Sequence, residues 1–139
     1  MGFSVPVALG AHVARPNDGE LVICGDGVFQ MTRMELSTIV RHGFAPVILV
    51  LNKGGYGTER FLHEGKWDYH EVHSWAYHKL PEVLRGGRSY DVSTEGEFDD
   101  ALTEAWLDRT GMSLIHVRLQ RHDASRPLRR MAERLGDRV

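Results

Sequence analysis

An unbroken apolar run, from Pro46 to Leu51, constrains the fold of this chain more than any other feature. Apolar and polar residues do not alternate along it, which is typical of a strand buried on both faces, as in a parallel sheet. Parallel strands need long crossover connections, so helices are expected between them. Shorter runs predict further strands at Glu20 to Cys24, Ser89 to Val92 and Ser113 to Leu119.

The segments between these strands carry helix signals. Two capping boxes, Thr32 to Glu35 and Thr94 to Glu97, predict helix starts, and Gly43 fits the end of the first of these helices. Strands alternating with helices predict an α/β fold: a three-layer α/β/α sandwich with a mainly parallel sheet, in one domain over residues 1–139. Further helices are predicted at Val7 to Ala14, near residues 75–85 and over the amphipathic tail from Ser125 to Arg138, with a long ordered loop over the rest of 61–80.

The composition excludes several classes of protein. The 139-residue chain has a formal net charge of −2, so a nucleic-acid binder held by phosphate neutralisation is not expected. No apolar run approaches the roughly 20 residues of a membrane-spanning helix. The N-terminus lacks the basic start of a secretory signal, so a cytoplasmic location is expected. The single cysteine, Cys24, lies in an apolar run and is interpreted as a buried reduced thiol.

Polar residues follow two of the predicted strands. Asp26 stands between Gly25 and Gly27 after the first strand, and Asn52 follows the apolar run. Ligands of parallel sheets bind beyond the carboxyl ends of the strands, and one crossover can bring these two ends to the same edge. A carboxylate there can bind Mg²⁺, and flanking glycines let a phosphate group approach the backbone. A single Gly-Asp-Gly is more often a simple strand-to-helix turn, so the prediction depends on both turns together.

Longer stretches surround these turns: Gly25-Asp26-Gly27-Val28-Phe29-Gln30-Met31-Thr32, Glu35-Leu36-Ser37-Thr38, Val50-Leu51-Asn52 and Gly55-Tyr56-Gly57-Thr58-Glu59. Together they resemble the thiamine-diphosphate signature of pyruvate and indolepyruvate decarboxylases, and the resemblance covers nearly the whole chain. It implies the C-terminal, cofactor-binding part of a thiamine-diphosphate-dependent 2-oxo acid decarboxylase. Such enzymes release CO₂ without oxidation from a substrate such as pyruvate, indolepyruvate or phenylpyruvate.

The resemblance also implies a role for each residue at the strand ends. Asp26 and the carbonyl of Gly55 would hold the Mg²⁺ that bridges to the diphosphate. Glu59 would be the catalytic residue, reaching toward the reacting carbon, although by itself it is more simply an exposed carboxylate at a helix start. Together with Asp26 and Gly55, the residues expected at the cofactor are Gly25, Gly27, Val28, Phe29, Asn52 and Tyr56.

Two features depart from the family pattern. Family members are several times longer, and the glutamate that activates their cofactor lies in an N-terminal domain of a partner subunit. The chain is therefore expected to be a fragment that lacks the first strand and helix of its domain. It is expected to be inactive alone and to associate with missing domains, a partner chain or a second copy of itself. The other departure is Lys53, which stands where the family has an Asn ligand. Because an ammonium group does not coordinate metal ions, weak binding of Mg²⁺ and cofactor is expected.

Other interpretations stay open. An acetolactate-synthase-like enzyme fragment would share the Gly-Asp-Gly core, although the stretch from Tyr56 to Glu59 favours the decarboxylases. Outside the enzymes, the alternative is a non-catalytic remnant that acts only in subunit association. Asp68, His70 and His73 could form a metal site, but an aromatic, polar loop is favoured. The arginines of the tail are attributed to a solvated helix face rather than to an RNA contact.

Overall fold

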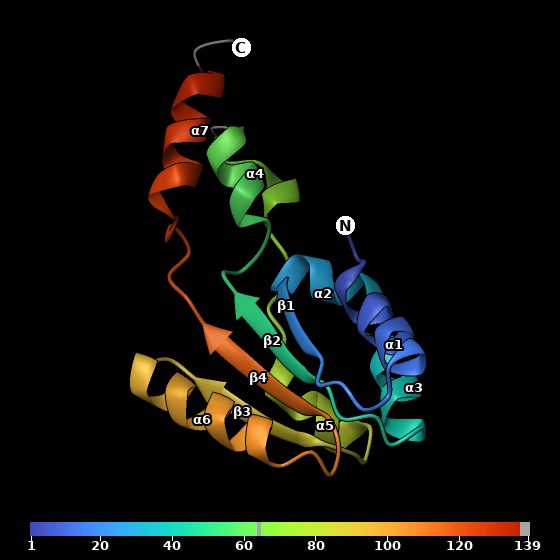
Figure 1. Ribbon diagram of the computed structural model, residues 1–139. Helices are drawn as coiled ribbons and strands as arrows, with labels where there is room; N and C mark the ends of the chain where they lie inside the picture. The colour runs from blue at the N-terminus through green and yellow to red at the C-terminus, as the bar shows by residue number, and fades with distance from the viewer. Residues whose placement is uncertain (64, 137–139) are drawn as a thin grey trace.

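The computed structural model describes residues 1–63 and 65–136 and contains a four-stranded parallel sheet (Figure 1). The strand order is β1-β2-β4-β3, so β2 and β4 are central. The first four residues of β2 and of β4 are all buried, which confirms the double-faced burial expected from the absence of alternation. The strands are β1 (Leu21–Gly25), β2 (Val47–Asn52), β3 (Arg88–Val92) and β4 (Ser113–Arg118).

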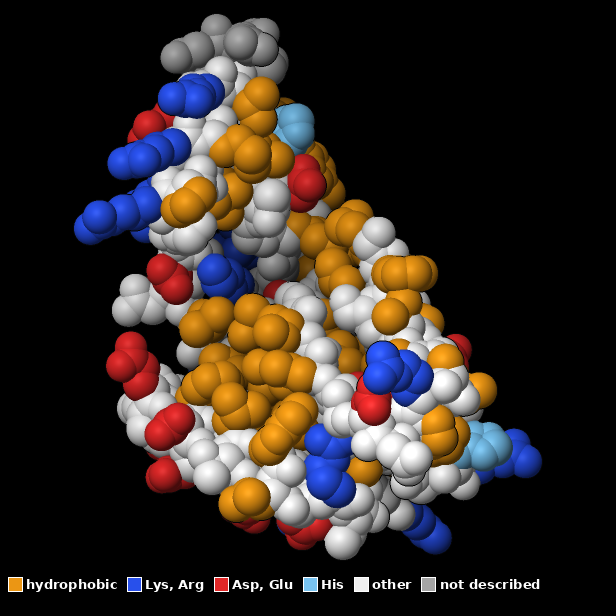
Figure 2. Space-filling view, viewed as in Figure 1, with side chains coloured by type: hydrophobic (Ala, Val, Ile, Leu, Met, Phe, Trp, Pro, Cys, Tyr) orange, Lys and Arg blue, Asp and Glu red, His pale blue; other side chains and the backbone are white. Residues whose placement is uncertain are grey.

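Within the described part of the chain, α6 (Glu95–Leu107) is the helix that covers one face of the sheet. Ala101 and Ala105 of this helix are buried against Leu49 and Ile115 of the central strands. On β1, the side chains of Leu21 and Ile23 remain 47% and 56% exposed. Hydrophobic side chains gather in the middle of the molecular face seen in Figure 2, over the strands between α6 and α7. Helix α6 therefore covers only part of this face of the sheet.

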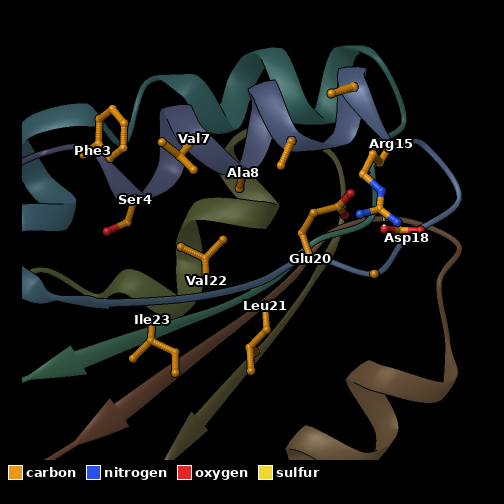
Figure 3. A pocket seen from close by; sticks show the side chains of 13 residues that line it. Phe3, Ser4, Val7, Ala8, Arg15, Asp18, Glu20, Leu21, Val22 and Ile23 are labelled. Atoms are coloured by element: carbon orange, nitrogen blue, oxygen red, sulfur yellow. Dashed lines mark ion pairs between the residues drawn. The ribbon is translucent and has the colours of Figure 1, made fainter.

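A groove of about 570 Å³ lies between α1 (Ser4–Ala14) and strand β1. Val22 points toward α1, whereas Leu21 and Ile23 point away from it (Figure 3). Phe3 and Val7 line the groove from the helix side and are 74% and 40% exposed. The β1 edge of the sheet thus carries apolar side chains that no described residue covers.

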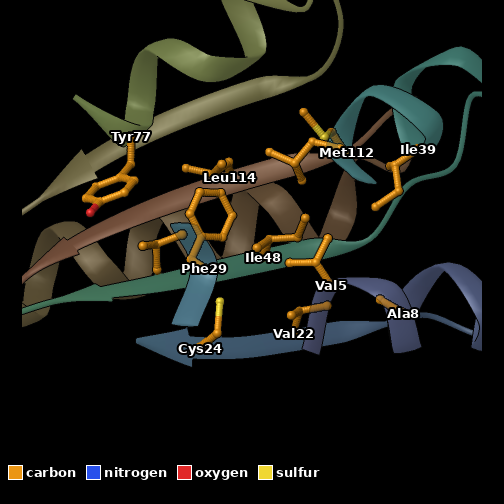
Figure 4. Close-up of a cluster of buried hydrophobic side chains, with 12 residues drawn as sticks. Val5, Ala8, Val22, Cys24, Phe29, Ile39, Ile48, Tyr77, Met112 and Leu114 are labelled. Carbon is orange, nitrogen blue, oxygen red and sulfur yellow. The ribbon is translucent and has the colours of Figure 1, made fainter. Parts of the chain in front are cut away.

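The opposite face of the sheet carries the main hydrophobic core. Helices α1, α2 (Asp26–Thr32), α3 (Glu35–Arg41) and α5 (Leu80–Val83) contribute to it, together with the 3₁₀ turn η2 (Tyr77–Lys79). Phe29 and Tyr77 meet edge to face above Ile48 and Leu114 (Figure 4). Helices on both faces of a parallel sheet confirm the three-layer α/β/α prediction. Cys24 is buried in this core, and burial raises the pKa of its thiol to about 12.

Two helices lie beyond the carboxyl ends of the strands. They are α4 (Gly57–Leu62) and α7 (Arg126–Gly136), which pack side by side at one end of the molecule (Figure 1). The short 3₁₀ turn η1 (Asp68–His70) lies near α4. The amphipathic tail is therefore helical up to residue 136, while residues 137–139 lie outside the described part. None of the described helices is both long and apolar enough to cross a bilayer.

The two predicted capping boxes had different outcomes. At α6 the box is present, with Thr94 Oγ1 accepting from the Glu97 amide at 3.2 Å. At Thr32 the prediction was wrong, because α2 already begins at Asp26 and Thr32 is its last residue. The next helix, α3, starts after Met34 without a side-chain cap. The predicted end of that helix is confirmed, since Gly43 has a positive φ of 66°.

The helix predicted near residues 75–85 is present but shorter than expected. The chain forms the 3₁₀ turn η2 and then only one helical turn, α5. Pro81 lies in the first turn of α5, where a missing amide proton costs nothing. Arg85 then adopts a left-handed backbone with φ of 55°, and Gly87 follows with φ of 87°. These backbone conformations end α5 after one turn.

Candidate functional site

The parallel pairing of β1 with β2 brings the two polar turns together. Gly25 pairs with Leu51 in the register, so Asp26 and Asn52 leave the sheet at the same edge. The Asp26 carboxylate is 1% exposed, and its Oδ2 accepts a hydrogen bond of 2.7 Å from the amide of Gly55. A buried carboxylate needs such a donor, because an unpaired buried charge is costly. The turn after β2 is thus attached directly to the turn after β1.

Gly55 sits where no other residue fits. Its φ is 130°, and a Cβ atom there would lie 2.1 Å from the carbonyl oxygen of His70. The same His70 carbonyl accepts a hydrogen bond of 2.9 Å from the Tyr56 amide. The Gly55 carbonyl in turn accepts from the Gly57 amide at 2.9 Å. Close backbone packing against the 61–80 loop therefore fixes this turn.

Arg60 holds the turn from the other side, a role that the sequence did not reveal. Its side chain is 7% exposed, and it donates to the carbonyls of Lys53 and Gly54. It also forms an ion pair of 3.4 Å with Glu71. Burial lowers the pKa of Arg60, and the negative charge of Asp26 partly opposes this shift. The sequence shows only that an arginine follows Glu59. That pattern does not distinguish a buried arginine from one exposed on a helix.

A cavity of about 170 Å³ lies against Asp26. Its wall includes Lys53, whose ammonium donates a hydrogen bond of 2.6 Å to the carbonyl of Asp123. The segment leading into α7 thus contributes to the wall of the cavity. The lining residues are Gly25, Asp26, Leu51, Lys53, Gly55, Gly57, Thr58, Phe61, Asp123 and Leu128.

The other predicted site residues lie outside this cavity's lining. The ring of Tyr56 covers Gly27, where a Cβ atom would lie 2.7 Å from it. Phe29 is fully buried in the main core, and Val28 packs against the same core. Both residues therefore stabilise the helix behind Asp26.

Asn52 and Glu59 point to other neighbours. The side-chain amide of Asn52 lies 2.9 Å from Nε2 of His116, on the main-core side of the sheet. Glu59 stands in the first turn of α4, 39% exposed, with its Oε2 3.8 Å from Nε2 of His63. Thr58 and Phe61 of that helix, rather than Glu59, line the cavity.

The metal candidates of the 61–80 loop do not gather. Asp68 and His73 are exposed, whereas His70 is 1% exposed. Among the described residues, a group of convergent metal-ligand atoms is instead formed by His78, Asp91 and His116. The spacing along the sequence gave no sign of this group, because its members come from three different elements.

Comparison with known proteins places this geometry in a family. Residues 1–117 match the family model described as "Thiamine pyrophosphate enzyme, C-terminal TPP binding domain". An "Alpha-keto-acid decarboxylase" of Mycolicibacterium paratuberculosis is 38% identical over 130 residues, which are 92% of this chain and 23% of that protein. The protein of the same description from Mycobacterium tuberculosis H37Rv gives the same identity and coverage, 38%, 92% and 23%.

A solved structure supports the same assignment. The "thiamine diphosphate-dependent 4-hydroxybenzoylformate decarboxylase" of Rhodococcus jostii RHA1 superposes with a TM-score of 0.78 at 29% identity. The match covers 90% of this chain and 24% of that one, so the chain spans about a quarter of the length of the proteins it matches. The chain belongs to the thiamine pyrophosphate enzyme family and corresponds to its C-terminal TPP-binding domain.

Proposed function

We propose that this chain is the thiamine-diphosphate-binding part of a non-oxidative 2-oxo acid decarboxylase. The observation that carries the proposal is the buried Asp26 carboxylate joined to the glycine turn at Gly55, beside a cavity at the carboxyl edge of a parallel sheet. That edge is where ligands of such sheets bind. The relatives named above are decarboxylases of keto acids, which supports a 2-oxo acid as the substrate class, with pyruvate, indolepyruvate and phenylpyruvate as candidates.

The residues present fit the diphosphate end of the cofactor. The cavity of about 170 Å³ is smaller than the roughly 300–1,000 Å³ of small-molecule pockets. It suits a phosphate-sized group rather than a whole cofactor. Gly25 has no atom within 4 Å of the position of a Cβ, so an anion can approach its backbone. The Lys53 ammonium supplies a positive charge in the same wall.

The fit to Mg²⁺ is less complete. Asp26 offers its second carboxylate oxygen, and Gly55 offers a carbonyl that already accepts from Gly57. Mg²⁺ prefers six oxygen ligands, which substrate phosphates and water commonly complete. Lys53 adds a cation where a further oxygen ligand would be needed. We therefore propose that Asp26 holds the metal, and that the magnesium dependence of cofactor binding is weak.

When bound, the cofactor would supply the electron sink for the loss of CO₂. The protein groups would bind and orient it, and Glu59 would act as the catalytic acid or base. Helix α4, which carries Glu59 in its first turn, begins directly after the glycine turn. The Glu59 side chain is 39% exposed, so it is not fixed by packing in the position beside His63.

Titration calorimetry with thiamine diphosphate, with and without Mg²⁺, tests the proposal. The chain should bind the cofactor, Asp26→Ala should abolish the part of the affinity that depends on Mg²⁺, and Glu59→Gln should bind as the parent does. No binding by the parent chain would reject the proposal and favour a non-catalytic remnant. Equal losses in both variants would remove the separate roles of Asp26 and Glu59.

Turnover is proposed to require more protein than this chain. The apolar groove between α1 and β1 and the exposed Leu21 and Ile23 form a surface of the kind that is covered in an assembly. The edge of β1 adds unpaired backbone groups. We expect a dimer or larger species by sedimentation and no release of CO₂ from pyruvate, phenylpyruvate or indolepyruvate. Turnover by a monomer would contradict both expectations.

A further inference from the structure

Two histidines and an aspartate converge behind the turn that follows β2. Asp91 of β3 and His116 of β4 are direct partners in the parallel register. His78 of the 3₁₀ turn η2 stacks on His116, with ring planes 13° apart. Asp91 and His116 stand on strands in the sheet, and His116 is only 3% exposed. Their positions are therefore fixed by the fold rather than by a mobile loop.

The ligand atoms of the three residues lie close enough together to converge on one metal ion. Nδ1 of His116 lies 3.0 Å from Oδ1 of Asp91, and Nδ1 of His78 lies 3.4 Å from Oδ2. The two Nδ1 atoms are 3.4 Å apart. Zinc takes nitrogen and oxygen ligands at about 2.0–2.1 Å, which puts ligand atoms of a tetrahedron roughly 3.3–3.4 Å from each other. The two distances to Asp91 go to different carboxylate oxygens, and one ligand atom from each residue brings the three atoms within 4.8 Å of one another. A turn of the Asp91 carboxylate would therefore accompany closure of the three ligands around an ion.

The hydrogen bonds of His116 also fit a metal ligand. Its Nε2 accepts from the side-chain amide of Asn52 at 2.9 Å, so the ring carries a single proton, on Nδ1, and is neutral. Neutral imidazole is the form that binds zinc and copper. The Asp91 carboxylate supplies the negative charge that a divalent ion requires.

Arg118 is a cationic group that opposes an ion here. It donates to both oxygens of Asp91, from Nε to Oδ1 at 2.7 Å and from Nη2 to Oδ2 at 2.5 Å. A carboxylate has about four lone-pair positions, so these bonds leave acceptor positions for a metal. The Arg118 side chain is 57% exposed, so solvent screens its repulsion of a cation.

Asn52 connects the cluster to the glycine turn. Its Oδ1 accepts from the Gly54 amide at 3.0 Å, so its Nδ2 faces Nε2 of His116 and must donate to it. The proton of the neutral ring is then on Nδ1, toward Asp91. An ion at Nδ1 would move that proton to Nε2, where it would meet the Asn52 amide donor. The amide must then rotate and release Gly54, which opposes metal binding.

We propose that His78, Asp91 and His116 form a binding site for a divalent transition metal such as Zn²⁺, separate from the cavity at Asp26. Three protein ligands leave a fourth position open for water or another small ligand. Binding reorients Asn52 and so acts on the turn at Gly54. An aspartate at position 52 would accept from both Nε2–H and the Gly54 amide, and would stabilise the bound form.

The test is a titration of the full chain with Zn²⁺, and with Co²⁺ monitored by visible absorption. The parent should bind one equivalent tightly and give the intense bands of four-coordinate cobalt. His78→Gln and Asp91→Asn should each weaken binding at least about tenfold. The chain has eight histidines, so the exposed His73→Gln serves as the matched control and should bind as the parent does. His78 is partly exposed, so its variant should keep the parent's circular dichroism.

Asn52→Asp gives a change of the opposite sign, about tenfold tighter binding of Zn²⁺. Equal affinities for His78→Gln and His73→Gln would overturn the proposal, as would six-coordinate cobalt spectra in the parent. An unchanged affinity in Asn52→Asp would overturn the link to the glycine turn.

Discussion

The turn at Gly55 and the start of helix α6 are both closed by backbone amides that donate to a carboxylate, but over very different distances along the chain. At α6, Glu97 accepts from the amides of Thr94 and Ser93, three and four residues away. At the turn, Asp26 accepts from Gly55, 29 residues further on. The closure at α6 links residues that are close together in the sequence. The second exists only after β1 has paired with β2, so the geometry of the candidate site depends on the complete sheet.

The largest expected effect is that of Gly55→Ala, which disturbs the turn that is hydrogen-bonded to Asp26. The positive φ of 130° and the approach to the His70 carbonyl both exclude a Cβ atom. We expect a loss of about 3 kcal/mol or more in the free energy of unfolding, measured by urea denaturation. Gly96→Ala in α6 is the control, because nothing lies within 4 Å of its Cβ position, and it should stabilise the helix by about 0.5–1 kcal/mol. Similar effects of the two changes would contradict the comparison.

Arg60→Ala removes the donor that holds the same turn. The carbonyls of Lys53 and Gly54 would lose partners in a region that is largely buried. We expect a loss of about 2 kcal/mol by the same measurement. Arg130→Ala, an exposed position on α7, should change stability by less than about 0.5 kcal/mol. If the two arginine variants have the same urea midpoint of unfolding, Arg60 does not hold the turn.

Lys53→Asn changes the chemistry of the turn while leaving its closure in place. An amide oxygen is a ligand that Mg²⁺ accepts, whereas the ammonium repels the ion. We expect thiamine diphosphate to bind about tenfold more tightly to the variant in the presence of Mg²⁺, or about 1.4 kcal/mol. Without Mg²⁺ the variant should bind no better than the parent. Tight magnesium-dependent binding by the parent would show that the site has another ligand.

Thr94→Ala tests the local closure. The loss of its side-chain cap should lower the free energy of unfolding by about 1 kcal/mol. Thr32→Ala is the matched control, because the capping box predicted there does not form, and it should cost less than half as much. Thermal unfolding of the two variants separates these outcomes, and a larger loss for Thr32→Ala would reverse the interpretation.

Glu97→Gln should have the smallest effect, and that effect should depend on pH. Hydrogen bonds from the Ser93 and Thr94 backbones lower the pKa of Glu97 below its usual value. The stability that the carboxylate adds is therefore present above about pH 4.5 and is lost as the pH falls through the folded-state pKa. At pH 7 the parent should melt at a higher temperature than the variant, and this difference should disappear in acid. A difference that persists at pH 2 would exclude the carboxylate as its source.

The sequence by itself predicted the elements whose signals are local or strongly periodic. The apolar β2 run, the capping box at Thr94 and the glycine at position 43 all appear where expected. The extended pattern around Asp26 also predicted the family that the comparisons confirm. Such features depend on neighbours within a few residues, or on stretches long enough to be specific.

Only the tertiary structure decided which distant groups meet. It buried Arg60 under the glycine turn, turned Asn52 toward His116, and gathered His78, Asp91 and His116 from three elements. It also made Thr32 a helix end, because the helix behind Asp26 starts earlier than the local box predicted. Side-chain direction and hydrogen-bond partners are set by packing between elements, and a one-dimensional pattern does not contain that packing.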